Sequence, residues 1–515
     1  MRLNIKNTTF CVLAFLTLLG GTGCTKWLID KDKDPSNFSP DTFYQSADQA
    51  LSALAAVYAQ TRFINGGAGI FANNFSMLEM VTGTARTETG QNADLNNILG
   101  LSYNGDNVFV NNWWNGPYSL IAQANLVITK VPGVPGMDDA TKKKYIGEAA
   151  FLRAWAYFYL VRLYGDVPLI LEPVDGTSPN LYAARTAATA VYDAIINDLT
   201  TAEAAGLDWT DQAGRVSLGA VKALLAEVYI TMAGTPLNKG TEYYQKAAAK
   251  AKEVIDSKKF DLFTNYSDLH STASNNKGEH IFEIQYLAGV VNNPNQGILL
   301  PNFKGISAYG TQIGSTVPTQ AFYNSFESGD LRKVDRQGFF YTSYYDQGYK
   351  DLKDLGAPYI YKFFDIIANG TSGVQGTASS GLNWPNIRYA QVLLTYAEAQ
   401  NLADGVPNQQ AWDGLNKIRV RAQLTTPALL TFTKQSFDDA ILRERWHELC
   451  YEGVSWFDMI RRRKVYVEAT NSFDNFVGHK LTEGGAVLAE KNLLFPLPTS
   501  EMQNNPNLKP NNPGY

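Results

Sequence analysis

Cys24 is the residue whose chemistry is most clearly defined by the sequence around it. Arg2 and Lys6 precede an apolar run over residues 10–19, and small residues occupy positions 20–23. A charged segment, a short apolar segment and a small-residue cleavage zone are typical of a secretory signal peptide. A cysteine directly after that zone is typical of a bacterial lipoprotein, in which the thiol becomes a thioether that carries lipid. The sequence therefore predicts a signal peptide over residues 1–23 and lipid attachment at Cys24.

The apolar run is about half as long as the ~20 residues that a membrane-spanning helix needs, so a transmembrane interpretation is disfavoured. Two or three acyl chains would instead hold the protein on a membrane, because each buried methylene contributes roughly 0.8 kcal/mol. An ordinary secretory signal with an incidental cysteine is the alternative. In both cases the residues after Cys24 are expected outside the inner membrane.

The other residues that could do chemistry form no convincing catalytic site. The segment His447–Tyr451 begins like a zinc-protease motif, but Tyr451 stands where the second histidine is needed. After removal of the signal peptide, Cys450 is the one cysteine besides Cys24, so no intramolecular disulfide is expected, and its apolar surroundings favour a buried thiol. No pair of acids stands out for glycoside hydrolysis. We predict no enzyme, no cofactor and no metal site.

Residues 24–40 are polar and acidic, and we expect a flexible, lipidated tether. Asp30, Asp32, Asp34 and Asp41 match the spacing of some ligands in a calcium-binding loop. That loop needs Gly where this chain has Pro35, and a longer Glu in place of its last aspartate. The departure from the motif disfavours calcium binding.

Composition limits the class of partner. The 515-residue chain has 44 Lys and Arg against 49 Asp and Glu, which gives a net charge of −5. Binding to phosphate backbones requires a basic face, so a nucleic-acid partner is not expected. A hydrophobic fraction of 45% supports a large core.

Helical periodicity dominates residues 41–515, which we interpret as a single domain. Apolar residues recur three and four positions apart, as at Leu51, Leu54 and Tyr58. Several helical segments come in Ala-rich pairs with a short turn, which is how tetratricopeptide-type repeats pack. The sequence predicts a mainly α fold, with a helix-pair (tetratricopeptide-like) scaffold and a few short strands. The segments with this periodicity are 41–61, 117–130, 140–164, 187–205, 217–233, 241–257, 387–403, 408–421, 435–452 and 455–463.

Two long irregular regions interrupt the helices, near residues 62–112 and 260–386. They are rich in Gly, Asn, Ser, Thr and Tyr, and residues 280–286 and 338–345 have the composition of strands. Loops of this length in a compact protein usually carry function. We expect these insertions to form the ligand face.

Four segments carry motifs that are more specific than composition. They are residues 151–169, which include Leu152-Arg153-Ala154-Trp155, and residues 387–422, 444–462 and 494–515. Together with the signal around Cys24, they resemble the SusD/RagB family of outer-membrane nutrient-binding lipoproteins of Bacteroidetes. The similarity covers essentially the whole mature chain.

This resemblance implies helix pairs that support a loop-rich ligand face. It implies a lipid-anchored protein of the outer membrane that faces the cell exterior, where it acts as a lid on a SusC-like TonB-dependent transporter. It also implies binding without catalysis, because members capture glycans, and some capture peptides, for import.

The charged residues of these motifs are expected to be structural. Buried ion pairs between arginines and carboxylates would lock helices together, and this explanation is preferred to catalysis. The residues concerned are Arg388, Glu398, Arg419, Arg421, Glu444, Glu448 and Glu452.

The ligand residues are sought in the two irregular regions. An aromatic ring can cover the C–H face of a pyranose, while carboxylates, amides and guanidinium groups bind its hydroxyls. For any one of these residues, packing in the core or a solvated loop position is the alternative. The predicted glycan-binding residues are Glu79, Arg86, Glu88, Asn104, Asn112 and Trp113 in the first region, and Tyr286, Tyr309, Tyr345 and Trp384 in the second.

A second hypothesis is that the ligand is a peptide or another nutrient. Backbone-directed amides such as Asn293, Asn295 and Gln296 would then matter more than aromatic rings.

Overall fold

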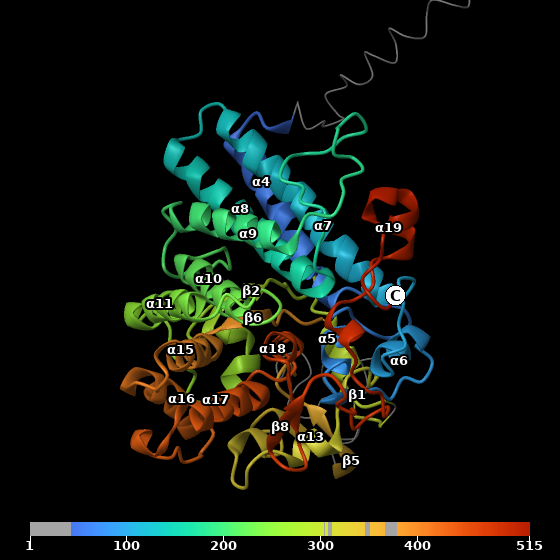
Figure 1. Cartoon of the computed structure of the whole chain (residues 1–515), viewed down its shortest axis with the longest axis vertical. Coiled ribbons are helices and arrows are strands. Elements are labelled where there is room, and N and C mark those ends of the chain that lie inside the picture. Colours follow the sequence, from blue (N-terminus) through green and yellow to red (C-terminus); the bar gives the residue numbers. More distant parts are fainter. Residues whose placement is uncertain (1–42, 303, 307–311, 346–350, 366–378) are drawn as a thin grey trace, which may run out of the picture.

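The computed structural model describes residues 43–302, 304–306, 312–345, 351–365 and 379–515 (Figure 1). The predicted signal peptide, Cys24, the tether and the aspartates with calcium-like spacing lie outside the described residues, as does Tyr309. Within the described ranges, no helix combines the length and the apolar character needed to cross a membrane.

Helices dominate the structure, as the periodicity predicts. The largest difference is at α7, which begins at Val108 and contains Pro117, whereas the sequence pattern predicts a start at 117. The Asn107 side chain caps this earlier start by accepting a hydrogen bond from the Phe109 amide. The long helices are α4 (Ala47–Gln60), α7 (Val108–Lys130), α8 (Asp139–Tyr164), α9 (Ala188–Glu203), α10 (Leu218–Ala233), α11 (Thr241–Ser257), α15 (Tyr389–Asp404), α16 (Gln409–Arg421), α17 (Lys434–Glu448) and α18 (Ser455–Arg462).

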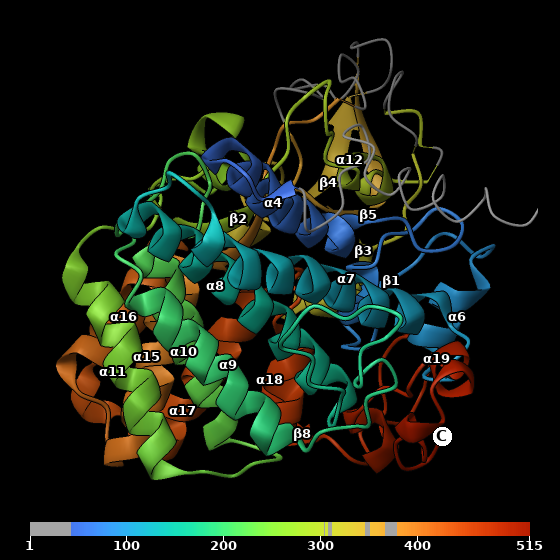
Figure 2. The same ribbon diagram turned by 90° about the horizontal axis from the view of Figure 1, so that it is seen from above.

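The long helices pack as successive neighbours. α7 lies on α8, α8 on α9, α10 on α11 and α15 on α16, and α11 also packs against α15. The two views show the result as a stack of helices that fills most of the molecule (Figures 1 and 2). This arrangement confirms the predicted mainly α fold.

The irregular regions contain short helices and two-stranded antiparallel pairs. The short helices are α5 (Ser76–Met80), α6 (Ala93–Leu99), α12 (Asn295–Leu299), α13 (Gln320–Asn324) and, near the C-terminus, α19 (Thr499–Asn504). The strand pairs are β1 (Ala85–Arg86) with β3 (Val317–Pro318), β2 (His280–Ile284) with β6 (Trp384–Arg388), β4 (Phe340–Tyr345) with β5 (Leu352–Ile360), and β7 (Lys464–Val467) with β8 (Ser472–Asn475).

Helix α8 is buried on all sides over its second half. Phe151 and Trp155 lie on one face of the helix and Leu160 lies on the opposite face, and all three are buried. Arg153 is buried as well, and its guanidinium donates to both carboxylate oxygens of Asp198 at 2.8 and 2.6 Å. Helix α8 therefore packs against several neighbouring helices at the centre of the scaffold.

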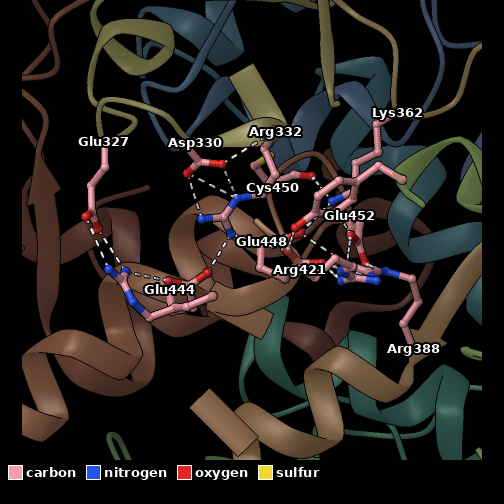
Figure 3. A network of polar contacts seen from close by, with 12 residues as sticks. Glu327, Asp330, Arg332, Lys362, Arg388, Arg421, Glu444, Glu448, Cys450 and Glu452 are labelled. Carbon is pink, nitrogen blue, oxygen red and sulfur yellow. Dashed lines mark hydrogen bonds and ion pairs between the residues drawn. The ribbon is translucent and has the colours of Figure 1, made fainter. Parts of the chain in front are cut away.

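A buried ionic network centred on Glu448 joins the helices to the irregular regions (Figure 3). Arg421 donates to Glu448 Oε1 at 2.6 Å, and Arg388 donates to the same oxygen at 3.2 and 3.3 Å. Arg332 donates to Oε2 at 3.2 Å, and the Tyr266 hydroxyl lies at 3.4 Å from it. The three arginines hold the pKa of Glu448 at about 2 despite its burial.

Further carboxylates balance these arginines. Glu452 accepts two hydrogen bonds from Arg388 at 2.6 and 2.9 Å, and it also pairs with Lys362. Glu279 pairs with both Arg388 and Arg421. Each guanidinium therefore meets carboxylates from different segments, so the network cross-links β6, α16, α17 and the loop that contains Lys362.

The network continues through Arg332. Asp330 accepts hydrogen bonds from this guanidinium at 2.8 and 2.9 Å, and Glu444 accepts one at 2.5 Å. Arg419 donates to Glu444 at 3.2 Å and to Glu327 at 2.8 Å, where the network reaches the half-buried rim.

A separate cluster forms around Glu398 of α15. Arg461 and Arg462 of α18 donate to this carboxylate, with the Arg461 bond to Oε2 at 2.7 Å, and Arg445 of α17 lies at 3.9 Å. Arg462 also pairs with Asp438. These clusters confirm the structural role predicted for the motif arginines and carboxylates.

Glu448→Gln should destabilise the protein strongly, because it leaves three buried guanidinium groups with one counter-charge fewer. We expect a loss of about 3–5 kcal/mol in the free energy of unfolding, measured by urea denaturation at pH 7. The wild-type contribution of Glu448 should be present above pH 4.5 and be lost as the pH falls toward 2.

The matched control is Glu242→Gln, which removes one charge from an exposed ion pair with Lys246 on α11. This control should leave the urea midpoint unchanged. Equal midpoints for both variants would contradict a structural role for the Glu448 network.

Candidate functional site

The two irregular regions of the sequence lie against each other. β1 of the first region pairs with β3 of the second. The Asn65 amide donates to the Tyr286 hydroxyl at 3.0 Å, and the Ser76 and Thr316 hydroxyls lie 2.8 Å apart. The predicted insertions therefore build one face, on the side of the molecule where α12, β4 and β5 stand in Figure 2.

Glu88 lies at the centre of an open cavity of about 290 Å³ in this face. Tyr359 donates its hydroxyl to Oε1 at 2.8 Å, and Arg86 donates to the same oxygen at 3.2 Å. The backbone amide of Asn302 donates to Oε2 at 3.0 Å. The carboxylate is therefore fixed from three directions: Oε1 accepts two hydrogen bonds, and Oε2 accepts one and keeps a lone pair for a further donor. Burial and the neighbouring Glu88 carboxylate raise the pKa of Tyr359, which keeps its hydroxyl protonated.

Phe71 forms the apolar wall of the cavity. Its side chain is 49% exposed, an unusual position for a large aromatic residue, and its φ angle of 58° is in the left-handed region. The loop is held by Asn92, which donates to the carbonyls of Ala68 and Ile70 at 3.1 and 2.8 Å. The Ser315 hydroxyl donates to the Phe71 carbonyl. These bonds position the loop that carries the exposed ring.

The arrangement suits a polyhydroxylated ligand. A fixed carboxylate can accept hydrogen bonds from hydroxyl groups, and an exposed ring beside it can cover a C–H face. Thr89, Gly90, Gln91 and Ile313 complete the lining of the cavity. Within the described residues, no group of three or more His, Cys, Asp or Glu side chains is arranged to hold a metal ion.

The structure brings together some of the predicted ligand residues. Arg86 and Glu88 form an ion pair at the cavity. Asn112 lies behind the Phe71 loop, where its amide donates to Asn74 Oδ1 at 2.8 Å. Asn104 is exposed elsewhere, since its neighbour Gly105 accepts a hydrogen bond from Thr499 of α19.

Tyr345 lies at the end of the β4–β5 hairpin where β4 connects to β5. Its partner in the register is Leu352, whereas Tyr359, which reaches Glu88, pairs with Tyr341. Four residues along a strand span about 13 Å, so Tyr345 stands well away from the Glu88 carboxylate. The Arg336 guanidinium lies over its ring at 5.6 Å.

Three of the predicted aromatic ligand residues are buried. Trp113 is fully buried beside Phe63, and its indole donates to the Asn74 carbonyl at 2.9 Å. Trp384 is buried against Phe363, with ring centroids 4.4 Å apart.

Tyr286, the third, is also buried, and burial raises the pKa of its hydroxyl to about 12. Rings covered by their own core have no face left for a ligand. Trp113, Trp384 and Tyr286 are therefore not part of the proposed binding surface.

Glu79 is likewise buried and belongs to the fold. Its Oε1 accepts a hydrogen bond from the Gly453 amide at 2.8 Å, which joins α5 to the start of the α18 segment. Burial raises the pKa of this carboxyl to about 7, although the Gly453 amide and Lys362 partly offset the increase. The carboxyl faces other protein groups and is not part of the ligand face.

The amides considered for a peptide ligand are structural as well. Asn293 donates to the Leu382 carbonyl at 2.8 Å, and Gln296 donates to the Phe363 carbonyl at 2.9 Å. Asn295 is fully buried and accepts a hydrogen bond from Asn73. None of the three presents an exposed amide.

The residues with catalytic potential are in the core. His447 contacts the Ser325 hydroxyl through Nε2 at 3.0 Å, and burial together with nearby arginines lowers its pKa. Cys450 is buried, and burial raises the pKa of its thiol to about 12, as expected for a structural cysteine.

Sequence reasoning missed Phe71, Asn302 and Tyr359. For Phe71 a signal was available, because it is the one aromatic residue in the Gly- and Asn-rich stretch 65–74. Asn302 and Tyr359 carry no such signal, since only the fold brings them to Glu88.

Comparison with known proteins decides the family. The sequence profile of the SusD family matches residues 340–515, and a profile described as starch-binding associating with outer membrane matches residues 32–230. A solved SusD superfamily protein of Parabacteroides distasonis is 40% identical with a TM-score of 0.86, over 91% of this chain and 99% of that one. The chain belongs to the SusD family.

One more distant relative and one solved structure extend the comparison. SusD-like protein P2 of Formosa agariphila is 28% identical over 539 residues, which cover 98% of this chain and 99% of the relative. Surface glycan-binding protein A of Bacteroides thetaiotaomicron, solved in complex with laminarihexaose, is 19% identical with a TM-score of 0.72 over 91% of this chain and 100% of that one. The predicted resemblance to the SusD/RagB family is confirmed.

Glu79 should give this SusD-family protein a pH-dependent stability near neutrality. Because its folded pKa of about 7 exceeds the ordinary value of 4.5, its contribution is fully present below pH 4.5 and is lost as the pH rises past 7. We expect a loss of roughly 2–3 kcal/mol from this group between pH 4.5 and pH 8. The measurement compares urea denaturation of wild type and Glu79→Gln at pH 5 and pH 8.

The Gln variant cannot ionise, so its advantage over wild type should grow with pH. Glu242→Gln again serves as the exposed control, and it should follow the wild-type pH response. If Glu79→Gln follows that response too, a different group is responsible.

Proposed function

We propose that this protein is a cell-surface lipoprotein that binds oligo- or polysaccharide and delivers it to a SusC-like TonB-dependent transporter of the outer membrane. The observation that carries the proposal is the open cavity in which the exposed Phe71 ring stands beside the fixed Glu88 carboxylate. The relative that binds laminarihexaose and the profile description of starch binding support a glycan as ligand.

In this proposal Phe71 covers the C–H face of one sugar ring, and Glu88 accepts a hydrogen bond from one of its hydroxyls through Oε2. Arg86, Tyr359 and Asn302 hold the carboxylate in place. Sugar hydroxyls are well solvated, so each new hydrogen bond contributes little net free energy, and the affinity for a short oligosaccharide should be weak. No catalytic step is included.

Attachment and orientation complete the proposal. Residues 1–23 act as the signal peptide, lipid on Cys24 holds the protein in the outer membrane, and residues 24–40 connect the lipid to a single domain over 41–515. The described core supports one domain, because a continuous hydrophobic cluster includes residues from Tyr44 to Leu508. The protein is then held on the exterior of the cell, where its ligand face can close over the transporter.

Replacing Phe71 should abolish glycan binding without affecting the fold. The test is affinity electrophoresis against a panel of polysaccharides, followed by calorimetry with a hexasaccharide of the one that is retained. We expect saturable binding by wild type, at least about a tenfold loss for Phe71→Ala and a smaller loss for Glu88→Gln.

Tyr182→Ala is the matched control, since it removes a 57% exposed ring from the loop between α8 and α9. This control should bind as wild type does. Retention of the glycan by Phe71→Ala would place the binding site elsewhere. Binding of peptides with no glycan bound would replace the glycan proposal with the peptide hypothesis.

Cys24→Ser should release the protein from the membrane. A serine hydroxyl cannot form the thioether, so the variant should move from the membrane pellet to the soluble fraction in the bacterial host. Cys450→Ser is the matched control, because that buried thiol lies in the core and should not affect fractionation. Membrane retention of Cys24→Ser would contradict lipid anchoring at this residue.

A further inference from the structure

A second and larger cavity lies away from the Glu88 face. It is a groove of about 790 Å³ between the C-terminal end of α8, the start of α9, the turn after α10, α18 and the C-terminal segment. Such a volume is within the range of sites that bind small molecules or a few residues of a peptide. Apolar residues form much of its lining, including Tyr192, Leu237, Phe457, Ile460 and Leu494.

Arg162 lines this groove without a carboxylate partner. Its Nε donates to the Phe158 carbonyl at 2.9 Å, and its guanidinium carbon lies 3.6 Å from the ring centroids of both Phe158 and Phe457. The Tyr159 hydroxyl is a further partner. The cation is therefore held between two aromatic rings, and within the described residues it forms no ion pair.

Arg185 is the second cation of this kind. It donates to the carbonyls of Asp166 and Pro510, both at 2.9 Å, and to Asn512 Oδ1 at 2.5 Å. These acceptors are neutral, so Arg185 forms no ion pair within the described residues, and the nearby Asp166 carboxylate only partly offsets its charge. Lys491, which is exposed on the same wall, lies over the Tyr515 ring at 5.4 Å.

These two arginines differ from the other described arginines whose pKa departs from its usual value. Where the pKa of an arginine departs from its usual value there, neighbouring carboxylates raise it, as at Arg388 and Arg461. At Arg162 and Arg185 burial lowers it, to about 10 for Arg162. Both exceptions line the same groove, which indicates an excess of positive charge at this place in a protein of net charge −5.

The acidic residues of the groove do not remove this excess. Asp166 uses Oδ1 to accept the Ala188 amide at the start of α9, at 2.8 Å. Glu490 pairs with Arg463 at 3.1 Å on the rim. Arg461 also lines the groove, but it forms ion pairs with Glu398 and Asp458, which neutralise its charge.

The groove and the Glu88 face lie on different sides of the molecule. α9, α18 and the C-terminal end are on the lower side in Figure 2, whereas α12, β4 and β5 are on the upper side. A ligand at one site therefore leaves the other accessible.

We propose that this groove is a docking site for an acidic, apolar peptide segment of a protein partner. Carboxylates of the segment pair with Arg162 and Arg185, and its apolar side chains cover Leu237, Phe457 and Ile460. Charge complementarity supports this occupant. Arg–carboxylate pairs are among the strong charge-assisted hydrogen bonds, and neither Arg162 nor Arg185 forms an ion pair within the described residues. Arginine and aromatic residues in an apolar pocket are also typical of interface centres. This inference does not depend on glycan binding.

The test uses the whole protein and a blocked peptide, acetyl-Ser-Leu-Asp-Phe-Asp-Leu-Ser-amide, in isothermal titration calorimetry. The matched probe has Asn in place of both Asp residues and differs only in charge. We expect saturable binding of one acidic peptide per protein, weakened about tenfold in the Asn peptide and about tenfold in Arg162→Met. Raising the salt concentration should weaken the binding further.

Arg463→Gln is the matched control variant, because Glu490 already neutralises that rim cation. It should bind the acidic peptide as wild type does, and all variants should keep glycan binding. Lys491→Gln, an exposed change that leaves the packing intact, provides a second test with an expected loss of a few fold.

Three results would overturn the proposal: no saturable binding of the acidic peptide to wild type, equal binding of the Asp and Asn peptides, or unchanged binding in both Arg162→Met and Lys491→Gln. If Arg162→Met does not fold, Lys491→Gln and the Asn peptide decide the question.

Discussion

The buried pairing of arginines with carboxylates around Glu448 is the interaction on which the rest of this structure depends. Each ion has lost its water, so each must find several partners, and a single carboxylate in this network accepts hydrogen bonds from two or three guanidinium groups. The partners come from segments far apart in the chain: Arg388 from β6, Arg421 from α16 and Arg332 from the second irregular region. Because the desolvation cost is offset only when all partners are in place, the network requires these segments to adopt one arrangement.

This arrangement supports the ligand face. Lys362 follows β5 and donates to the carbonyls of Glu448 and Cys450 at 2.7 and 3.0 Å, so the β4–β5 hairpin is attached to the centre of the scaffold. On the same strand, Tyr359 reaches Glu88 and fixes its carboxylate. A weak ligand is bound best by groups that need no rearrangement, since ordering them during binding would cost free energy. The rigid network therefore supports the proposed ligand cavity, although it does not itself line that cavity.

The helices could be predicted from the sequence because each one repeats its apolar residues with the helical period, which is a local property. The structural role of the motif arginines could be predicted for a related reason, because so many charges in apolar segments must neutralise one another. The candidate site was predicted only in part. Glu88 lines the cavity and Arg86 pairs with it, but Trp113 and Trp384 belong to the core. Phe71 was not among the predicted residues. An aromatic residue in an irregular region has the same sequence signal whether its ring faces the core or the solvent.

The sequence by itself determined the helix pairs and the membership of the SusD family, since both depend on residue types at short and regular spacing. The tertiary structure alone decided which side chains remain free to bind. Trp113 is covered by Phe63 and Tyr159, while Phe71 is left uncovered. Within the described residues, Arg162 and Arg185 form none of the close ion pairs that neutralise arginines of the core such as Arg388 and Arg461. Whether a side chain is exposed, and whether its charge is neutralised, depends on segments that are distant in the sequence and become its neighbours only in the fold. The local sequence pattern around the residue does not contain this information.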